Sequence, residues 1–366
     1  MLQQSFLIPI IKVTDSCNFN CEFCYYAQKK TKSRLMTEVE CKNIIRLCFE
    51  YNVKQHNKRM RIIFHGGEPL LQPIGFYKEM VAYEKELAQT QKDFIFLNSI
   101  QTNGYLLNDE LIDFFKNEEF NVGISIDGGV SLNCHFGESG VVESTKTVLK
   151  NIAKLNAAGV DFGIISVITN KHTLFPSELY HFCVENGIHD LSLNYCYDQN
   201  EKNTVSNEKL IPFVKTLFDL YANGDYELNV REFNEIIAKC TGYNTDTCAM
   251  CDRCNCGQYL SFDVDGNVFF CDTGYDKSTA IGNIKTHTLY EIVDSYSYLK
   301  KLWECRSVYE KYCLNCEVKD ICGGGCHRYD IRGTDSFLNN YFCPTHKELT
   351  RHISDYVKNI LSNNEK

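Results

Sequence analysis

The first 222 residues alternate between short hydrophobic runs and longer amphipathic runs. The hydrophobic runs predict six strands, at 6–13, 60–64, 94–101, 122–125, 162–168 and 191–195. The amphipathic runs that follow them predict helices at 37–51, 74–87, 109–116, 141–155, 176–185 and 207–221. Strands that alternate with helices predict an α/β fold with a parallel sheet. Because six units are fewer than the eight of a closed barrel, we expect an open, partial (β/α)6 barrel with its chemistry at the carboxyl ends of the strands.

The pattern changes from about Arg231 onward. Helical periodicity fades, and cysteines, glycines and short β-like runs at 259–264 and 267–270 replace it, before a last predicted helix at 345–361. Cysteine-dense segments with few apolar runs usually need a metal to fold. We therefore expect two domains, residues 1–230 and residues 231–366.

Composition and charge narrow the class of protein. The 366 residues include 38 basic and 47 acidic side chains, for a formal net charge of −9, which argues against a nucleic-acid partner. No apolar run is long enough to span a bilayer, and the amino-terminal residues do not look like a secretory signal, so we expect a cytoplasmic protein. In that compartment the 20 cysteines are more often metal ligands or catalysts than disulfides.

The first predicted strand runs into three closely spaced cysteines. Cys17, Cys21 and Cys24 have the spacing C-x3-C-x2-C. Three thiolates on one loop can hold three irons of a 4Fe–4S cluster and leave the fourth iron open for a small ligand. The string by itself also fits a structural zinc loop or a few buried cysteines.

A second motif, Gly66-Gly67-Glu68-Pro69, follows the second predicted strand. Glycines let a ligand approach the backbone, and a glutamate can accept from an ammonium group, although an ordinary turn also fits. Together the two motifs resemble the radical S-adenosylmethionine (SAM) superfamily. That resemblance implies a cluster on Cys17, Cys21 and Cys24 whose open iron chelates SAM.

The same resemblance implies reductive cleavage of SAM to a 5′-deoxyadenosyl radical that takes a hydrogen atom from the substrate. It also implies an electron from a flavodoxin- or ferredoxin-type partner. The candidates that would contact SAM or line the substrate pocket are Phe23, Gly66, Gly67, Glu68, Gln101, Asn103, Ser125 and Asp127. The last four stand in Asn-Gly and Asp-Gly segments, which are also good plain turn signals.

A second field of cysteines lies near the carboxyl terminus. It contains C-x9-G-x4-C at Cys256–Cys271 and C-x2-C-x5-C-x3-C at Cys313–Cys326, followed by Cys343. A zinc ribbon would use only four ligands, fewer than this field offers. The field resembles the SPASM domain of radical SAM maturases, which carries two auxiliary 4Fe–4S clusters. The implied cofactors are therefore SAM and three 4Fe–4S clusters.

Carried over by order, this resemblance assigns the auxiliary ligands. Auxiliary cluster II takes Cys313, Cys316, Cys322 and Cys343. Auxiliary cluster I takes Cys256, Cys271, Cys326 and one upstream cysteine. The upstream ligand is Cys248, Cys251 or Cys254, and we choose Cys251 because the family typically places it about five residues before the next ligand.

Over nearly its full length the chain resembles anaerobic sulfatase-maturating enzymes. In that family the aspartate directly after the second SPASM cysteine is the proposed base, which points to Asp272. A carboxylate beside a cluster is a plausible base, and a turn aspartate in Cys-Asp-Thr-Gly is the alternative.

One segment departs from that family. The stretch 129–138 lacks the arginine that reaches SAM there, so His135 or a distant residue compensates, or the substrate class differs. We therefore expect an enzyme that forms a thioether, carbon–carbon or ether crosslink, or an epimerised residue, in a ribosomally made precursor peptide. With 16 residues before the cysteine triad, we expect no leader-binding domain at the amino terminus.

Three other functions fit parts of the sequence. One is sulfatase maturation, the oxidation of a cysteine or serine to formylglycine. The others, from different classes, are a non-catalytic iron–sulfur electron carrier and a structural zinc protein. The triad with an open iron, next to the Gly-Gly-Glu-Pro motif, argues against the last two.

Overall fold

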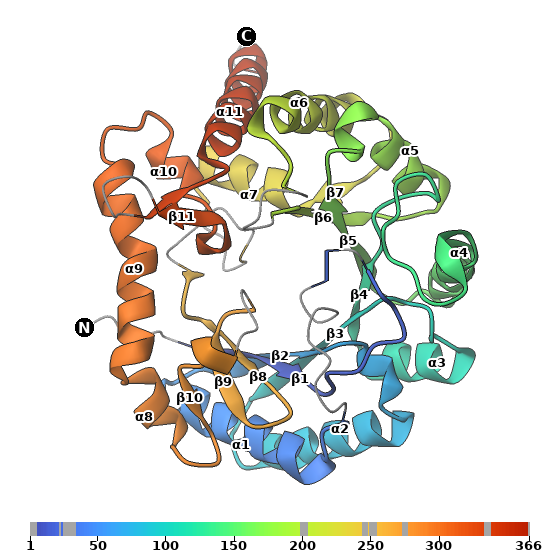
Figure 1. Cartoon of the computed structure of the whole chain (residues 1–366), viewed down its shortest axis with the longest axis vertical. Coiled ribbons are helices and arrows are strands. Elements are labelled where there is room, and N and C mark those ends of the chain that lie inside the picture. The colour runs from blue at the N-terminus through green and yellow to red at the C-terminus, as the bar shows by residue number, and fades with distance from the viewer. Residues whose placement is uncertain are drawn as a thin grey trace. The chain divides into compact units, whose positions relative to one another are not determined.

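The computed structural model describes residues 6–21, 23–24, 34–197, 204–243, 248, 255–272, 277–332 and 338–364. The chain forms two compact units, each assembled from three segments. Unit 1 comprises Met1–Ile126, Asn133–Gly163 and Gly257–Lys301. Unit 2 comprises Asp127–Leu132, Ile164–Cys256 and Leu302–Lys366. Figure 1 labels the helices and strands of both.

Unit 1 is built on a sheet with the strand order β10-β9-β8-β1-β2-β3-β4. The strands are β1 (Ile8–Lys12), β2 (Arg59–His65), β3 (Ile95–Thr102), β4 (Asn121–Ser125), β8 (Tyr259–Phe262), β9 (Asn267–Phe270) and β10 (Gly282–Asn283). Strands β8, β1, β2, β3 and β4 run parallel, with Ile8 of β1 opposite Tyr259 of β8. All five residues of β1 are buried, as expected for a parallel strand covered on both faces.

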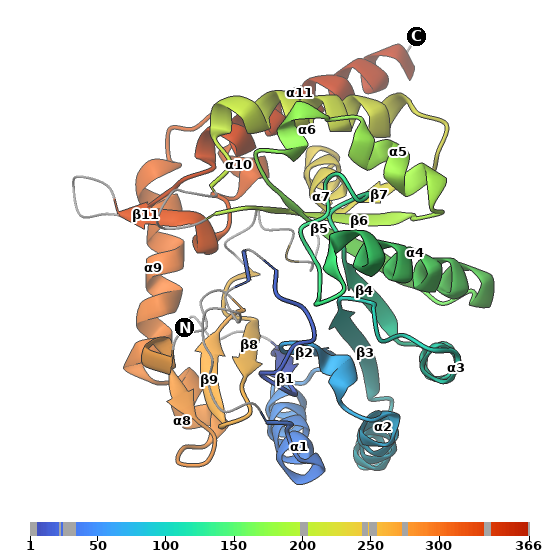
Figure 2. The same cartoon turned by 45° about the vertical axis from the view of Figure 1, so that its right-hand side comes forward.

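The helices of unit 1 include the crossovers between its parallel strands. They are α1 (Glu38–Lys54), α2 (Ile74–Gln89), α3 (Asp109–Asn117), α4 (Gly140–Ala158) and α8 (Leu289–Val293). Helix α1 begins at Thr37 because the side chains of Thr37 and Glu40 each accept from the other's backbone N–H, a capping box. Helices α1 and α2 pack against each other and against β1, β2 and β3 (Figure 2).

Unit 2 contains a smaller set of parallel strands and most of the carboxyl-terminal helices. The strands are β5 (Phe162–Ile168), β6 (Asp190–Tyr195) and β7 (Asn229–Val230), with an antiparallel pair of β11 (Asp330–Arg332) and β12 (Leu338–Asn340). The helices are α5 (Glu178–Glu185), α6 (Asn207–Asn223), α7 (Arg231–Cys240), α10 (Lys319–Cys322) and α11 (Cys343–Asn364). Helix α9 (Tyr296–Tyr312) begins in unit 1 and belongs to unit 2 from Leu302 onward. Helix α11 packs against α6 and α7 (Figure 1).

These elements confirm the predicted α/β class, with parallel strands joined by helices. The expectation that helices fade after Arg231 is wrong, because α7 begins at that residue and the 17-residue helix α9 follows later. Helix α9 has a weak apolar pattern, since Tyr296 and Trp303 are exposed while Leu302 and Cys305 are buried. Among the residues that the structure describes, no helix is both long and apolar enough to cross a membrane.

Candidate active site

The cysteine triad follows β1 on a short loop. The backbone N–H of Cys24 donates to the carbonyl of Cys21 at 3.2 Å, and the N–H of Phe19 donates to the Cys17 sulfur at 3.3 Å. Desolvation raises the pKa of the Cys17 thiol to about 12, and Glu68, Cys21 and Cys24 raise it further through their charges. The charges that act on Cys17 show that the three thiols lie close together, as ligands of one cluster must.

The turn after β2 is bonded to the start of this loop. The N–H of Gly67 donates to the carbonyl of Thr14 at 2.9 Å, and the N–H of Glu68 donates to that of Ser16 at 2.7 Å. A Cβ at Gly67 would lie 2.0 Å from the carbonyl oxygen of Ser16. Gly67 is thus required by the approach of the protein's own backbone, in addition to any ligand.

The Glu68 carboxylate joins the ends of β2 and β3. It is 1% exposed and accepts from the N–H of Leu70 at 2.9 Å, the hydroxyl of Thr102 at 2.6 Å and the N–H of Asn103 at 2.8 Å. Burial raises its pKa to about 7, although these three donors oppose the shift. Glu68 therefore fixes the positions of both strand ends, and its contact with SAM stays a prediction.

Two of the predicted site residues, Gln101 and Asn103, lie at the end of β3 and donate hydrogen bonds to polar neighbours. The Asn103 amide donates to Asn18 Oδ1 at 2.8 Å and lies 4.0 Å from the Cys17 sulfur, so it reaches the cysteine loop. The Gln101 amide donates to the Ser125 hydroxyl at 2.9 Å. Their contacts with SAM or substrate stay predictions.

Asp127 belongs to unit 2, where it is fully buried. Its Oδ1 accepts from the N–H of Val167 at 2.7 Å, and its carbonyl oxygen lies 2.9 Å from His172 Nε2. These contacts anchor the residue to β5 and to the turn that follows. Its predicted contact with SAM stays a prediction.

Asp272 is held by two basic side chains of unit 1. Lys12 Nζ lies 2.8 Å from Asp272 Oδ1, and His65 Nε2 lies 3.8 Å from Oδ2. Lys12 is 2% exposed and Asp272 is 26% exposed, so the lysine is the buried partner. Burial lowers the pKa of His65, and the charge of Asp272 opposes that shift. The sequence analysis missed Lys12, although a lone lysine in the apolar strand Ile8–Lys12 was a visible signal.

The four predicted ligands of auxiliary cluster II line one pocket of unit 2. They are Cys313, Cys316, Cys322 and Cys343. Burial raises the pKa of the Cys322 thiol to about 12, and the other three cysteines add to the shift through their charges. A pocket with four convergent thiols fits a 4Fe–4S cluster.

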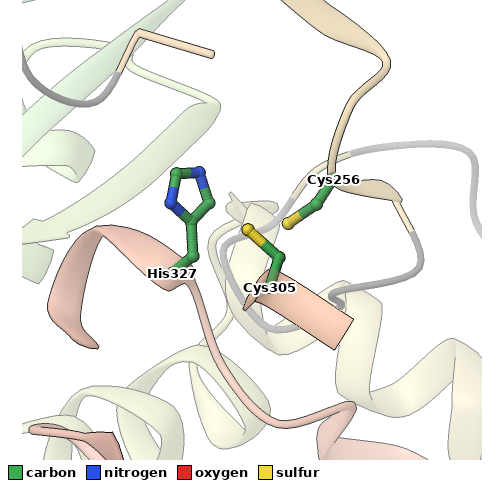
Figure 3. Close-up of side chains that lie close together, drawn as sticks. All are labelled: Cys256, Cys305 and His327. Carbon is green, nitrogen blue, oxygen red and sulfur yellow. The ribbon is translucent and has the colours of Figure 1, made fainter. Parts of the chain in front are cut away.

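A second group in unit 2 includes two residues that the sequence analysis did not select. The ligand atoms of Cys256, Cys305 and His327 lie within 4.8 Å of one another. Figure 3 shows the two sulfurs turned toward each other, with Cys305 on α9 and the His327 ring beside it. Such a Cys2His set suits a tetrahedral metal ion.

The structure describes some of the predicted ligands of auxiliary cluster I and not others. Burial raises the pKa of the Cys326 thiol to about 12, and the charges of Cys248 and Cys256 add to it, so these cysteines are near one another in unit 2. Cys271 belongs to unit 1, and Cys251 and Cys254 lie outside the described residues. The ligand set of this cluster stays a prediction.

Comparisons with known families match both halves of the chain. The radical SAM superfamily matches residues 11–182, and the SPASM iron–sulfur cluster-binding domain matches residues 251–317. A cysteine-type anaerobic sulfatase-maturating enzyme of Clostridium novyi is 26% identical over 94% of this chain and 94% of its own length. A serine-type enzyme of Bacteroides thetaiotaomicron is 25% identical over 93% and 87%.

Solved structures agree on the fold. Native anSMEcpe with bound AdoMet and Cp18Cys peptide has a TM-score of 0.84, 22% identity, and a match over 98% of this chain and 99% of that one. Streptococcus suis SuiB bound to S-adenosylmethionine has a TM-score of 0.64, 18% identity, and a match over 93% and 77%. The chain therefore carries a radical SAM domain, which contains the cysteine triad, and a SPASM iron–sulfur cluster-binding domain.

Proposed function

We propose that this enzyme oxidises a cysteine or serine side chain in a peptide segment of a protein substrate, with Asp272 as the proton acceptor. The observation that carries the proposal is the ion pair of 2.8 Å between Asp272 and the buried Lys12. A carboxylate held in place can act as a general base for a neighbouring substrate group. The names of the full-length relatives, which are cysteine-type and serine-type sulfatase-maturating enzymes, support this substrate class.

The missing arginine argued for a different substrate class, and the structure weakens that argument. Residues of the same stretch contact the cysteine loop, with His135 Nδ1 3.3 Å from the Cys21 sulfur. This position beside a predicted cluster ligand supports His135 as the compensating residue.

The chain's own residues have separate roles in this proposal. Cys17, Cys21 and Cys24 hold the SAM-binding cluster, and the four thiols of the unit 2 pocket hold an auxiliary one. When bound, SAM and these clusters supply the hydrogen-abstracting radical and a store for the second electron. Asp272 takes the proton that the substrate thiol or hydroxyl releases, and Lys12 fixes the carboxylate. A flavodoxin- or ferredoxin-type protein is the proposed electron donor.

A crosslink or an epimerised residue in a ribosomally made precursor peptide is the second candidate function. The absence of arginine from residues 129–138 is the observation that favours it. Both candidates share SAM cleavage and hydrogen abstraction, so the modified residue distinguishes them.

The test uses anaerobically reconstituted full-length enzyme with SAM, reductant and three synthetic sulfatase-type peptides. The peptides carry cysteine, serine or alanine at the target position. We expect an aldehyde, detected by hydrazide labelling, in the cysteine or serine peptide and none in the alanine control. SAM cleavage without aldehyde in either peptide, together with loss of hydrogen from a candidate precursor peptide, would replace this proposal by the second candidate.

A further inference from the structure

The segment after β4 is paired with the cysteine loop in unit 1. The N–H of Asn20 donates to the carbonyl of Phe136 at 2.9 Å, and Phe19 forms a β-bridge with Gly137. A Cβ at Gly137 would lie 2.8 Å from the carbonyl oxygen of Asn18, so glycine permits this close approach. The pairing places the residue just before Phe136 beside the predicted cluster ligands.

That residue, His135, has a fixed backbone. Asn133 Oδ1 accepts from its N–H at 3.1 Å, and Asn133 Nδ2 donates to its carbonyl at 3.0 Å. The same amide also donates to the Thr145 hydroxyl on α4 at 2.9 Å. Asn133 thus ties His135 to a long helix, and the histidine is 9% exposed.

The imidazole ring lies between two residues of the cysteine loop. Its Nδ1 is 3.3 Å from the Cys21 sulfur, and its ring meets Phe23 edge-on, with 5.1 Å between centroids and an interplanar angle of 84°. A metal-bound thiolate can only accept a hydrogen bond. With a cluster on Cys21, the proton of this contact must therefore be on Nδ1 of His135.

We propose that His135 is a positioning residue for the SAM-binding cluster, which donates an Nδ1–H hydrogen bond to the Cys21 sulfur. The bond fixes the side chain of one ligand and withdraws electron density from its thiolate. Hydrogen bonds to cluster sulfurs stabilise the reduced, more negative state and so raise the reduction potential. The inference rests on the cysteine triad and is independent of the peptide substrate proposed above.

Three variants of full-length, reconstituted enzyme separate the effect of the hydrogen bond on the cluster from the effect of the aromatic ring. His135→Phe keeps an aromatic ring beside Phe23 without a donor, His135→Ala removes both, and His135→Asn keeps an N–H close to the position of Nδ1. Replacement of the exposed His287 by Ala is the control. The readout is the electron paramagnetic resonance signal of the reduced cluster that changes on SAM addition, titrated against potential without peptide.

The bond is present in both states but is stronger in the reduced, more negative one, so its loss should lower the ratio of reduced to oxidised cluster about tenfold at a fixed potential. For a one-electron couple this is a shift of about 59 mV to lower potential. We expect the shift in the Phe and Ala variants and a value near wild type for Asn and for the control. A wild-type potential in His135→Phe would overturn the inference.

Cluster loading provides a second readout if a variant assembles poorly. Iron and sulfide lost in His135→Phe but retained in His135→Asn would support a ligand-positioning bond. Equal loss in both would show that only the packing of the histidine matters and would overturn the inference. Because no peptide is present, neither outcome depends on which residue the enzyme modifies.

Discussion

Lys12 and Asp272 form an ion pair in which the base is buried and the acid is partly exposed. Their charged atoms are 2.8 Å apart, and the exposed fractions are 2% and 26%. The two partners are therefore unequal. Loss of the carboxylate leaves a cation inside the protein, whereas loss of the lysine leaves a carboxylate that water can reach.

This asymmetry predicts the outcome of a double-mutant cycle. Asp272→Asn should lower the free energy of unfolding by about 3 kcal/mol, because the buried Lys12 loses a carboxylate 2.8 Å from its charge. Lys12→Met should cost about 1 kcal/mol, and the double variant should recover most of the loss from Asp272→Asn. Urea denaturation under anaerobic conditions gives these values. The half-exposed pair of Lys42 and Glu79, at 3.0 Å, is the matched control, in which either single change should be nearly neutral.

Activity in the same cycle tests the role of Asp272 separately from stability. If Asp272 is the proton acceptor, modified peptide should fall by about a hundredfold or more in both Asp272→Asn and the stable double variant. SAM cleavage should continue, so 5′-deoxyadenosine should form without product. A double variant that regains both stability and product would show that Asp272 acts only through the fold.

The amino-terminal cysteines should be required for SAM cleavage alone. Replacement of Cys17, Cys21 and Cys24 by Ala should abolish 5′-deoxyadenosine while leaving roughly eight of about twelve irons, because the auxiliary ligands are separate. Cys48→Ala, which removes a fully buried thiol of α1, should keep both. Any 5′-deoxyadenosine made by the triple variant would contradict the assignment.

Glu84, a buried carboxyl group of α2, should make stability depend on pH. Burial raises its pKa from 4.5 to about 8, although the hydrogen bond of 2.6 Å from Asn98 opposes the shift. Its stabilising contribution is thus fully present below 4.5 and is lost as the pH rises through about 8. Between about pH 6 and about pH 9, wild type should lose about 2 kcal/mol of stability more than Glu84→Gln. Glu79→Gln, on an exposed side chain of α2, should keep the wild-type dependence, and an unchanged dependence in Glu84→Gln would refute the idea.

The group of Cys256, Cys305 and His327 should bind Zn²⁺ when no cluster is loaded. Its ligand atoms lie within 4.8 Å of one another, and two sulfurs and one nitrogen are common zinc ligands. Cys305→Ala and His327→Ala should each weaken Zn²⁺ binding by the cluster-free chain roughly tenfold or more. Cys183→Ala, a buried thiol of α5, should leave it unchanged. Competition with a colorimetric chelator measures the affinity, and equal affinities in all variants would exclude this site.

The sequence predicted the elements whose burial pattern is periodic. Strand β5 alternates buried and half-buried residues over Phe162–Ile168, and the predicted bounds are those of the structure. Helix α9 has a weaker pattern, because among its described side chains Tyr298, Leu302 and Cys305 are buried whereas the large apolar Tyr296 and Trp303 face water. Its formation depends on packing that a local window does not contain.

The candidate active site shows the same difference between features that a local stretch of sequence predicts and features that depend on tertiary packing. Cys17, Cys21 and Cys24 are neighbours in the sequence, so their spacing, taken together with the Gly66–Pro69 motif, predicted a shared site. Contacts such as Cys21 with His135 join residues 114 positions apart and depend on how two loops pair. The lysine at position 12 could be seen in an apolar strand, but its partner could be identified only once β8 and β9 were placed beside β1.

Strand β1 also determines how the protein can be divided. It lies between β2 and β8, so a chain cut after residue 230 would lose the neighbour on one side and turn β1 into an edge strand. The segment Ile8–Lys12 is buried in the whole chain and almost entirely apolar, and an unpaired apolar edge is a template for strand addition by another molecule. The isolated amino-terminal part should therefore self-associate, and strands of the cysteine-rich part also cap the sheet that carries the Cys17–Cys24 loop.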